Sequence, residues 1–184
     1  MSATPVPQPP APGPPAPQPP SPQPPAPRPL NFWHPASLLA TWFGCGLLPK
    51  APGTWGSLAA LPVAFVIVAL AGSWGLLAAA ILATFVGVWA AGVYAARSGQ
   101  ADPQRVVIDE VAGQWLALVP VAQDLRLYAV AFLAFRFFDI VKVWPAGRID
   151  RELKGGWGIM LDDVVAGLYA AALTYGIALL WPLP

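Results

Sequence analysis

One stretch of this chain limits its possible folds more than any other: the 46 residues from Ala51 to Ala96 contain no charged side chain. A single bilayer crossing needs about 20 apolar residues, so this stretch is long enough for two crossings. Gly72-Ser73-Trp74-Gly75 interrupts it and favours a turn. We therefore predict two membrane-spanning helices, at roughly 57–72 and 74–96. The alternative is a soluble helical bundle with a very apolar core.

Three further apolar segments follow, at roughly 106–122, 127–145 and 159–182. Together with the first two they predict an all-α, polytopic membrane helical bundle over residues 36–184. The segment 38–48 is too short to cross a bilayer, and we expect an interfacial or buried helix there.

The first 35 residues form a separate tail, which holds 16 of the 24 prolines. Such a tract favours extended polyproline II structure and cannot build a core, so we expect it to be disordered. It lacks the basic start and apolar run of a secretory signal peptide, and we expect it to be retained. It is either a plain linker or a docking segment for an unknown protein partner.

The loop cations predict the orientation in the membrane. If the crossings alternate, one side receives nearly all of them: Arg28, Lys50, Arg97, Arg105, Arg148, Arg151 and Lys154. The other side receives only Arg126, close to Asp124. Positive charge accumulates on the cytoplasmic side, so the loops 97–105 and 146–158 are predicted to be cytoplasmic. The net charge of +1, without a basic stripe interleaved with aromatic residues, argues against nucleic-acid binding.

Carboxylates inside these apolar segments are the main functional signal. A charged group in a membrane helix is costly unless it is partnered, so such residues usually mark function. The predicted topology gathers them near one face of the membrane, although they are scattered along the sequence. Five acids with almost no His or Cys beside them favour a hard, oxygen-liganded metal such as Mg²⁺. The candidate metal ligands are Asp109, Glu110, Asp139, Asp162 and Asp163. Alternatively, the acidic pairs only complement helix dipoles.

Each acidic pair is followed by small residues, Ala112-Gly113 and Ala166-Gly167. Small residues allow helices to approach closely, which would bring acids on two helices within reach of one ion. Neighbouring residues on a helix point about 100° apart. Each pair is therefore expected to give one inward ligand and one supporting group.

Cationic residues near the acids suggest phosphate binding. Arg136, Asp139 and Lys142 have the spacing i, i+3, i+6, which predicts one shared helical face. They suit a phosphate-plus-metal site, or else an internal ion-pair network. The loop before the first span offers Lys50, Gly53, Thr54 and Ser57 at a helix N-terminus, which suits either a phosphate or a capped turn. The segment 147–158 is either a surface for anionic lipid headgroups or a solvated connector.

The sequence lacks the residues that several known phosphatase mechanisms require. The only cysteine, Cys45, is followed six residues later by Ala51, so the arginine of the thiolate phosphatases is missing. His34 is the only histidine, and neither a P-loop nor an aspartyl-phosphate signature is present. Metal-assisted attack by water remains for a phosphate-handling protein.

Four strings resemble the phosphatidylglycerophosphatase A family, in the same order and from about Gly44 to the C-terminus. They are LLPKAPGTWGSLAALP (47–62), VVIDEVAGQW (106–115), FRFFDIVKVWP (135–145) and GGWGIMLDDVVAG (155–167). The resemblance implies a Mg²⁺-dependent, multi-pass phosphatase of the bacterial inner membrane. Such an enzyme removes the terminal phosphate of phosphatidylglycerophosphate and leaves phosphatidylglycerol. Val143 stands where the family usually has a proline, so a local change in the helix end is expected.

For that reaction, the candidate residues fall into a catalytic group and a phosphate-binding group. The candidate catalytic residues are Asp109, Glu110, Asp139, Asp163, Lys142 and Arg136. The candidate phosphate-binding residues are Lys50, Gly53, Thr54, Ser57, Arg136 and Lys142. Asp163 or Glu110 would take a proton from water, although a carboxylate nucleophile remains an alternative. In another class of function, the acids would line the path of a small cation transporter or channel, which would need charges near the midplane and on both faces.

Overall fold

The computed structural model describes residues 29–121 and 123–180, and most of the proline-rich tail lies outside them. All regular structure in these ranges is helical, which confirms the predicted all-α class. The helices are α1 (Pro35–Ala40), the short 3₁₀ helix η1 (Cys45–Leu47), α2 (Pro52–Ser98), α3 (Ile108–Leu118), α4 (Leu125–Val141), α5 (Ala146–Glu152) and α6 (Gly155–Leu180).

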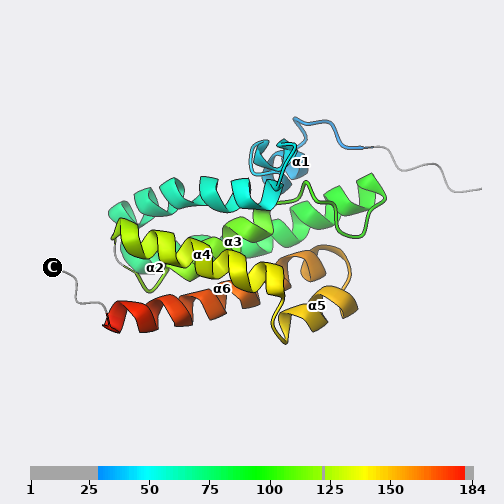
Figure 1. Cartoon of the computed structure of the whole chain (residues 1–184). Coiled ribbons are helices and arrows are strands. Elements are labelled where there is room, and N and C mark those ends of the chain that lie inside the picture. Colours follow the sequence, from blue (N-terminus) through cyan, green and yellow to red (C-terminus); the bar gives the residue numbers. More distant parts are fainter. Residues whose placement is uncertain (1–28, 122, 181–184) are drawn as a thin grey trace, which may run out of the picture.

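The long helix α2 reverses direction at Gly72, as the sequence predicts. Gly72 has φ 67° and ψ −173°, values that are not helical and that favour glycine. The residues before and after it form two arms, 52–71 and 73–98, and Figure 1 shows the second arm running back toward the start of the first. The uncharged stretch therefore folds as a helical hairpin.

Two helices, α2 and α6, are long and apolar enough to cross a membrane. Their outer surfaces carry large apolar side chains that pack against nothing within the described chain. Leu70 and Trp74 are each 83% exposed, and Leu180 is 85% exposed. Such a surface is unfavourable in water and matches a lipid-facing one.

The third predicted span is shorter than expected. Helix α3 has 11 residues, not the 17 of the apolar segment 106–122. At 1.5 Å per residue it is about 16 Å long, well below the ~30 Å of a bilayer core. Nine of its residues are buried, between α2 on one side and α6 on the other. The segment is apolar because α3 forms the centre of the bundle.

The segment around α1 covers one end of this bundle. Ala36 and Ala40 are fully buried, and the Ala40 carbonyl accepts a hydrogen bond from the Val107 N–H at 2.8 Å. The Trp42 ring meets Trp115 of α3 edge to face, with the ring centroids 5.6 Å apart. This segment therefore packs along α3, from Val107 just before its start to Trp115.

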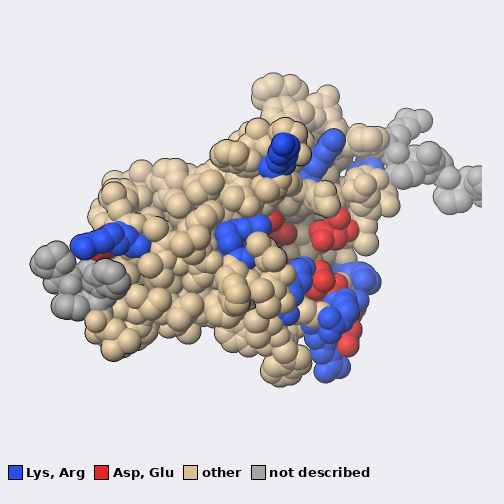
Figure 2. Space-filling model, in the orientation of Figure 1, with Lys and Arg blue, Asp and Glu red and all other residues tan. Residues whose placement is uncertain are grey.

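Charged residues gather at the same end of the molecule. The start of α2, the start of α3, the end of α4, helix α5 and the start of α6 all meet there (Figure 1). Figure 2 shows acidic and basic side chains around a hollow at this end, and a long uncharged surface beside it. The chain thus places polar groups from five elements around one opening.

Candidate active site

The hollow is a cavity of about 410 Å³. All five acids that the sequence singled out contribute to its wall, and so do Gly53, Arg136 and Lys142. The other lining residues are Ala51, Pro52, Ala101, Asp102, Gln104, Val106, Asp150, Leu153, Lys154, Gly155, Gly158 and Ile159. The gathering of the acids, predicted from the topology, is present.

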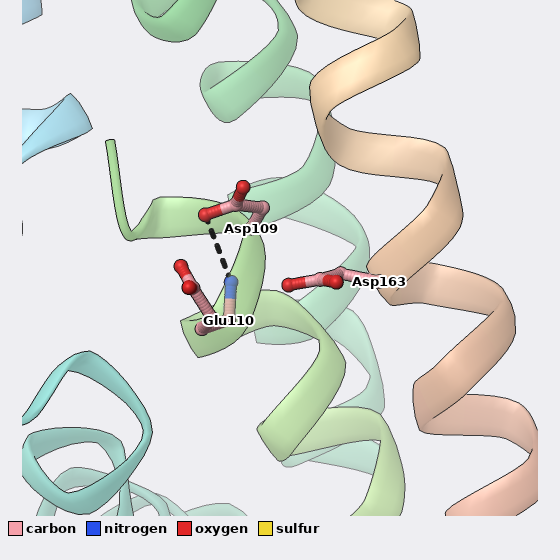
Figure 3. Close-up of side chains that lie close together, drawn as sticks. All are labelled: Asp109, Glu110 and Asp163. Carbon is pink, nitrogen blue, oxygen red and sulfur yellow. Dashed lines mark hydrogen bonds between the residues drawn. The ribbon is translucent and has the colours of Figure 1, made fainter. Parts of the chain in front are cut away.

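Three of the carboxylates form a tight cluster. Asp109, Glu110 and Asp163 each place a carboxylate oxygen within 4.8 Å of the other two (Figure 3). Asp163 is only 4% exposed, and a buried oxygen of Glu110, Oε2, has no hydrogen-bond partner among the described residues. Like charges at this separation repel strongly away from bulk water. The cluster therefore needs a cation or protons to be stable.

The cluster depends on a close contact between α3 and α6. A Cβ atom added at Gly167 of α6 would overlap the carbonyl oxygen of Gly113 in α3. A Cβ added at Gly113 would lie 2.6 Å from the Asp163 carbonyl oxygen. Only glycine at both positions permits this spacing, and the small residues predicted it. The contact lies about one turn from the acids, and it sets the distance between Asp163 and the α3 pair.

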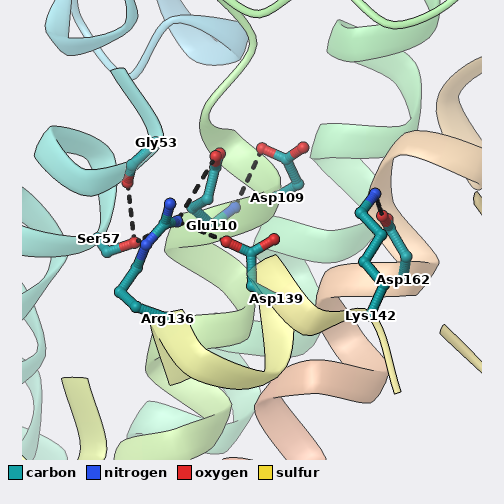
Figure 4. Close-up of polar contacts among 8 residues, drawn as sticks. All are labelled: Gly53, Ser57, Asp109, Glu110, Arg136, Asp139, Lys142 and Asp162. Atoms are coloured by element: carbon teal, nitrogen blue, oxygen red, sulfur yellow. Dashed lines mark hydrogen bonds and ion pairs between the residues drawn. The ribbon is translucent and has the colours of Figure 1, made fainter. Parts of the chain in front are cut away.

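Arg136 of α4 lies beside Glu110 of the cluster (Figure 4). Its Nη1 lies 2.7 Å from Asp139 Oδ2 and 3.9 Å from Glu110 Oε1, and it donates to Ser57 Oγ at 3.5 Å. Ser57 Oγ donates in turn to the Gly53 carbonyl at 2.9 Å. The start of α2 thus helps to fix the guanidinium group, and Asp139 is paired with it.

Lys142 has other partners than predicted. Helix α4 ends at Val141, and Lys142 has a left-handed backbone with φ 48°. Its ammonium group lies 2.7 Å from Asp162 Oδ2 on α6 and 2.8 Å from Asp150 Oδ1 on α5. The prediction of one continuous helical face with Arg136 and Asp139 is therefore wrong for Lys142. Burial alone would lower the pKa of Lys142, but its hydrogen bonds to Asp150 and Asp162 raise it.

The candidate phosphate loop is only partly at the cavity. Gly53 lines it, and a Cβ there would overlap Glu110 Oε1, so the glycine leaves room for the acid. Lys50 is exposed and Thr54 half-buried, and neither lines the cavity. The Lys50 carbonyl accepts a hydrogen bond from Trp55 Nε1 at 3.0 Å. Ser57 contributes to the site through the hydrogen bond that it accepts from Arg136.

Sequence reasoning missed four polar residues of the cavity wall: Asp102, Gln104, Asp150 and Lys154. Asp150 and Lys154 lie in the charged segment 147–158, for which the sequence predicts either a lipid-binding surface or a connector. Within that segment Asp150 looks no different from Glu152, which pairs with Arg148 on the outside at 2.9 Å. Only the position of α5 against α6 distinguishes the two acids.

The donor set fits a hard divalent cation. In the described part of the chain, seven carboxylates and three cationic side chains line the cavity, a formal difference of −4 (7 negative, 3 positive). Asp139 and Asp162 have cationic partners within 2.7 Å, whereas Asp109 and Asp163 have none within 4.0 Å in the described ranges. Clustered carboxylate oxygens without sulfur or imidazole are the ligands that Mg²⁺ prefers. Asp109, Glu110 and Asp163 would hold it.

Comparisons with known proteins agree with the four motifs. Residues 38–178 match the model of a family described as phosphatidylglycerophosphatase A. The chain is 40% identical to phosphatidylglycerophosphatase A of Escherichia coli over 83% of this chain and 87% of that protein. It is 36% identical to phosphatidylglycerophosphatase A of Haemophilus influenzae over 80% and 91% of the two chains.

A third relative carries another name. A Bacteroides thetaiotaomicron protein named "Putative phosphatidylinositol-3-phosphatase" is 43% identical over 74% of this chain and 89% of its own length. All three names describe phosphatases of phosphorylated glycerolipids. No solved structure matches the chain.

Proposed function

This chain belongs to the phosphatidylglycerophosphatase A family, and from that premise we propose that it hydrolyses phosphatidylglycerophosphate to phosphatidylglycerol and inorganic phosphate with the help of Mg²⁺. The observation that carries the proposal is the cluster of Asp109, Glu110 and Asp163, of which only Glu110 has a cationic partner among the described residues, in a cavity that also holds Arg136 and Lys142. A cation-binding group beside cationic side chains suits a phosphate monoester dianion.

In the proposed reaction, a water oxygen forms a bond to phosphorus while the bond from phosphorus to the glycerol oxygen breaks. When bound, Mg²⁺ supplies charge neutralisation at the phosphate oxygens. Glu110 or Asp163 accepts the proton of the attacking water, and that proton returns to the departing glycerol oxygen. The products are a lipid alcohol and inorganic phosphate, so atoms and charge balance.

The cationic residues stabilise charge on the phosphoryl oxygens. Arg136 offers a planar, permanently charged donor group beside the cluster. It is oriented by Asp139 at 2.7 Å and by Ser57 at 3.5 Å, so little reorganisation is needed when the phosphate enters. Lys142 lies on the α5–α6 side of the same cavity. Together they offer the phosphate positive charge from two sides.

The membrane would present the substrate. Helices α2 and α6 support insertion by their length and apolar surface, and the cavity lies at the charged end of the bundle. We assign this end to the cytoplasmic side of the bacterial inner membrane, because the loop cations gather there. A lipid phosphate made in the inner leaflet would then be hydrolysed without leaving that leaflet.

The direct test is phosphate release by the purified, full-length protein in detergent–lipid micelles. We expect release from phosphatidylglycerophosphate with Mg²⁺ and none after chelation. Phosphatidylinositol 3-phosphate and phosphatidic acid serve as comparison substrates, since one relative is named for the former lipid. Faster turnover of phosphatidylinositol 3-phosphate would reassign the substrate. Cation flux in vesicles without any phosphate release would favour a transporter.

A further inference from the structure

Lys142, which stabilises charge on the phosphoryl oxygens in the proposed reaction, also forms an ion-pair bridge at the cavity edge. The Lys142 ammonium lies between Asp162 of α6 at 2.7 Å and Asp150 of α5 at 2.8 Å. It thereby joins the end of α4 to two other helices. Asp150 lines the cavity, and its side chain is 37% exposed.

We propose that Asp150 is a positioning residue, which holds the Lys142 ammonium in the orientation that receives the phosphate group of the substrate. The inference rests on the proposed function and extends it to helix α5. Asp150 itself does not touch the substrate in this proposal.

Lysine needs such an anchor more than arginine does. Its ammonium group is a point charge on four flexible carbons, whereas the planar guanidinium group of arginine is pre-organised and loses less freedom for each hydrogen bond that it forms. The ammonium group has three N–H donors. The two carboxylates accept from two of them, which leaves one donor for a phosphate oxygen. Asp162 and Asp150 come from different helices, and together they define a direction that a single partner would leave free.

The backbone supports this role because α5 is fixed relative to Lys142. Ala146 and Gly147 at the start of α5 are buried. A Cβ added at Gly147 would lie 2.7 Å from the carbonyl oxygen of Lys142, so the first turn of α5 packs directly on that peptide unit. Asp150, one turn further along, is therefore held at a defined distance from the Lys142 side chain.

The same helix provides a matched control. Glu152 lies two residues after Asp150 and pairs with Arg148 at 2.9 Å, with both side chains about 60% exposed (61% and 59%). It does not line the cavity. Glu152→Gln removes the same charge from the same helix without affecting the bridge, so its turnover should stay at the wild-type level.

The experiment is a double-mutant cycle with Asp150→Asn and Lys142→Ala in the full-length protein. Asp150→Asn should lower kcat by about 10- to 100-fold, by analogy with residues that orient the ligands of a metal ion. In the Lys142→Ala background the same change should add less than about twofold, because residues that act through one another are not additive. Asp150→Glu, which keeps the carboxylate, should recover part of the rate and shows that the fold tolerates change here.

Two results would overturn the proposal. One is an unchanged kcat for Asp150→Asn; if KM falls at the same time, Asp150 competes with the phosphate. The other is an equal loss with and without Lys142, which would indicate a structural role.

A second measurement tests the role of Asp150 independently of which lipid is the substrate. The same cycle is run on the binding of inorganic phosphate by calorimetry, which needs no turnover. Asp150→Asn should weaken phosphate binding about tenfold, but only when Lys142 is present. If this holds while phosphatidylglycerophosphate is not hydrolysed, the proposed function fails and the role of Asp150 stands. If lipid hydrolysis is normal but the cycle shows no coupling, only the inference fails.

Discussion

Gly113 of α3 lies directly against Gly167 of α6, so closely that a single methyl group at Gly167 would overlap the Gly113 carbonyl oxygen. One turn away from this contact, Asp163 approaches Asp109 and Glu110 to within 4.8 Å. The spacing of the carboxylate cluster thus follows from two residues that have no side chain.

The first prediction concerns this contact. Gly167→Ala should push α6 away from α3, destabilise the protein by about 1–3 kcal/mol and widen the cluster, so that activity falls with stability. The measurement is thermal unfolding in detergent together with phosphate release. Gly176→Ala is the matched control on the same helix, since a Cβ there meets nothing within 4 Å. Equal behaviour of the two variants would contradict the packing argument.

The second prediction concerns the three clustered acids. Asp109→Asn, Glu110→Gln and Asp163→Asn should each reduce Mg²⁺-dependent phosphate release by about 100-fold or more, because each removes a charge from the reacting centre. The proteins should still insert into membranes. Asp124→Asn, at the opposite end of the bundle, should retain activity, although it weakens the cap of α4. Normal turnover in two of the three cluster variants would disprove the metal assignment.

Replacing Asp162, which is paired with Lys142, should affect Mg²⁺ affinity less than replacing Asp163 does. Asp162→Asn removes a partner of Lys142 at 2.7 Å and leaves the three-carboxylate cluster intact. We expect a loss of turnover with nearly normal Mg²⁺ affinity, whereas Asp163→Asn should weaken both. Calorimetric titration with Mg²⁺ distinguishes the two outcomes.

Metal removal gives a prediction that does not depend on substrate. Binding of an ion to the folded state alone stabilises it by RT ln(1 + [L]/Kd), which is about 2.7 kcal/mol at 100 times Kd. Mg²⁺ should therefore raise the melting temperature of the wild-type protein, and chelation should reverse the rise. Asp163→Asn should lose most of this response. An equal response in that variant would place the ion elsewhere.

Replacing Lys142 and replacing Lys50 should have different effects on turnover, although the sequence predicts that both bind phosphate. Lys142→Ala should lower turnover strongly, and Lys142→Arg should retain part of it, because the charge remains but the geometry changes. Lys50→Ala should have a small effect, since Lys50 is exposed and does not line the cavity. Comparable losses at both positions would show that the start of α2 moves toward the phosphate.

The orientation in the membrane can be tested by cysteine labelling in a Cys45→Ser background. Single cysteines at Ser98 and Arg151 should be shielded from an impermeant reagent added to intact cells, and one at Gln123 should react. The reverse labelling pattern would place the cavity outside the cytoplasm.

The sequence alone determined the helical class, the break at Gly72 and the set of acids at one end. These follow from local quantities: the length of an uncharged stretch, the position of glycines and the distribution of Lys and Arg along the chain. The small residues after each acidic pair also predicted the close approach of α3 and α6.

Only the tertiary structure decided how the five acids divide. Asp139 and Asp162 have cationic partners at 2.7 Å, whereas Asp109, Glu110 and Asp163 form a cluster in which only Glu110 has one, at 3.9 Å. Asp162 and Asp163 are adjacent and chemically identical, so no local pattern separates them. Asp150 belongs to the site only because α5 packs beside Lys142. Helix α4 ends one residue before Lys142. Ion-pair partners depend on distances of a few ångströms between helices, and those distances are set by packing across the whole bundle.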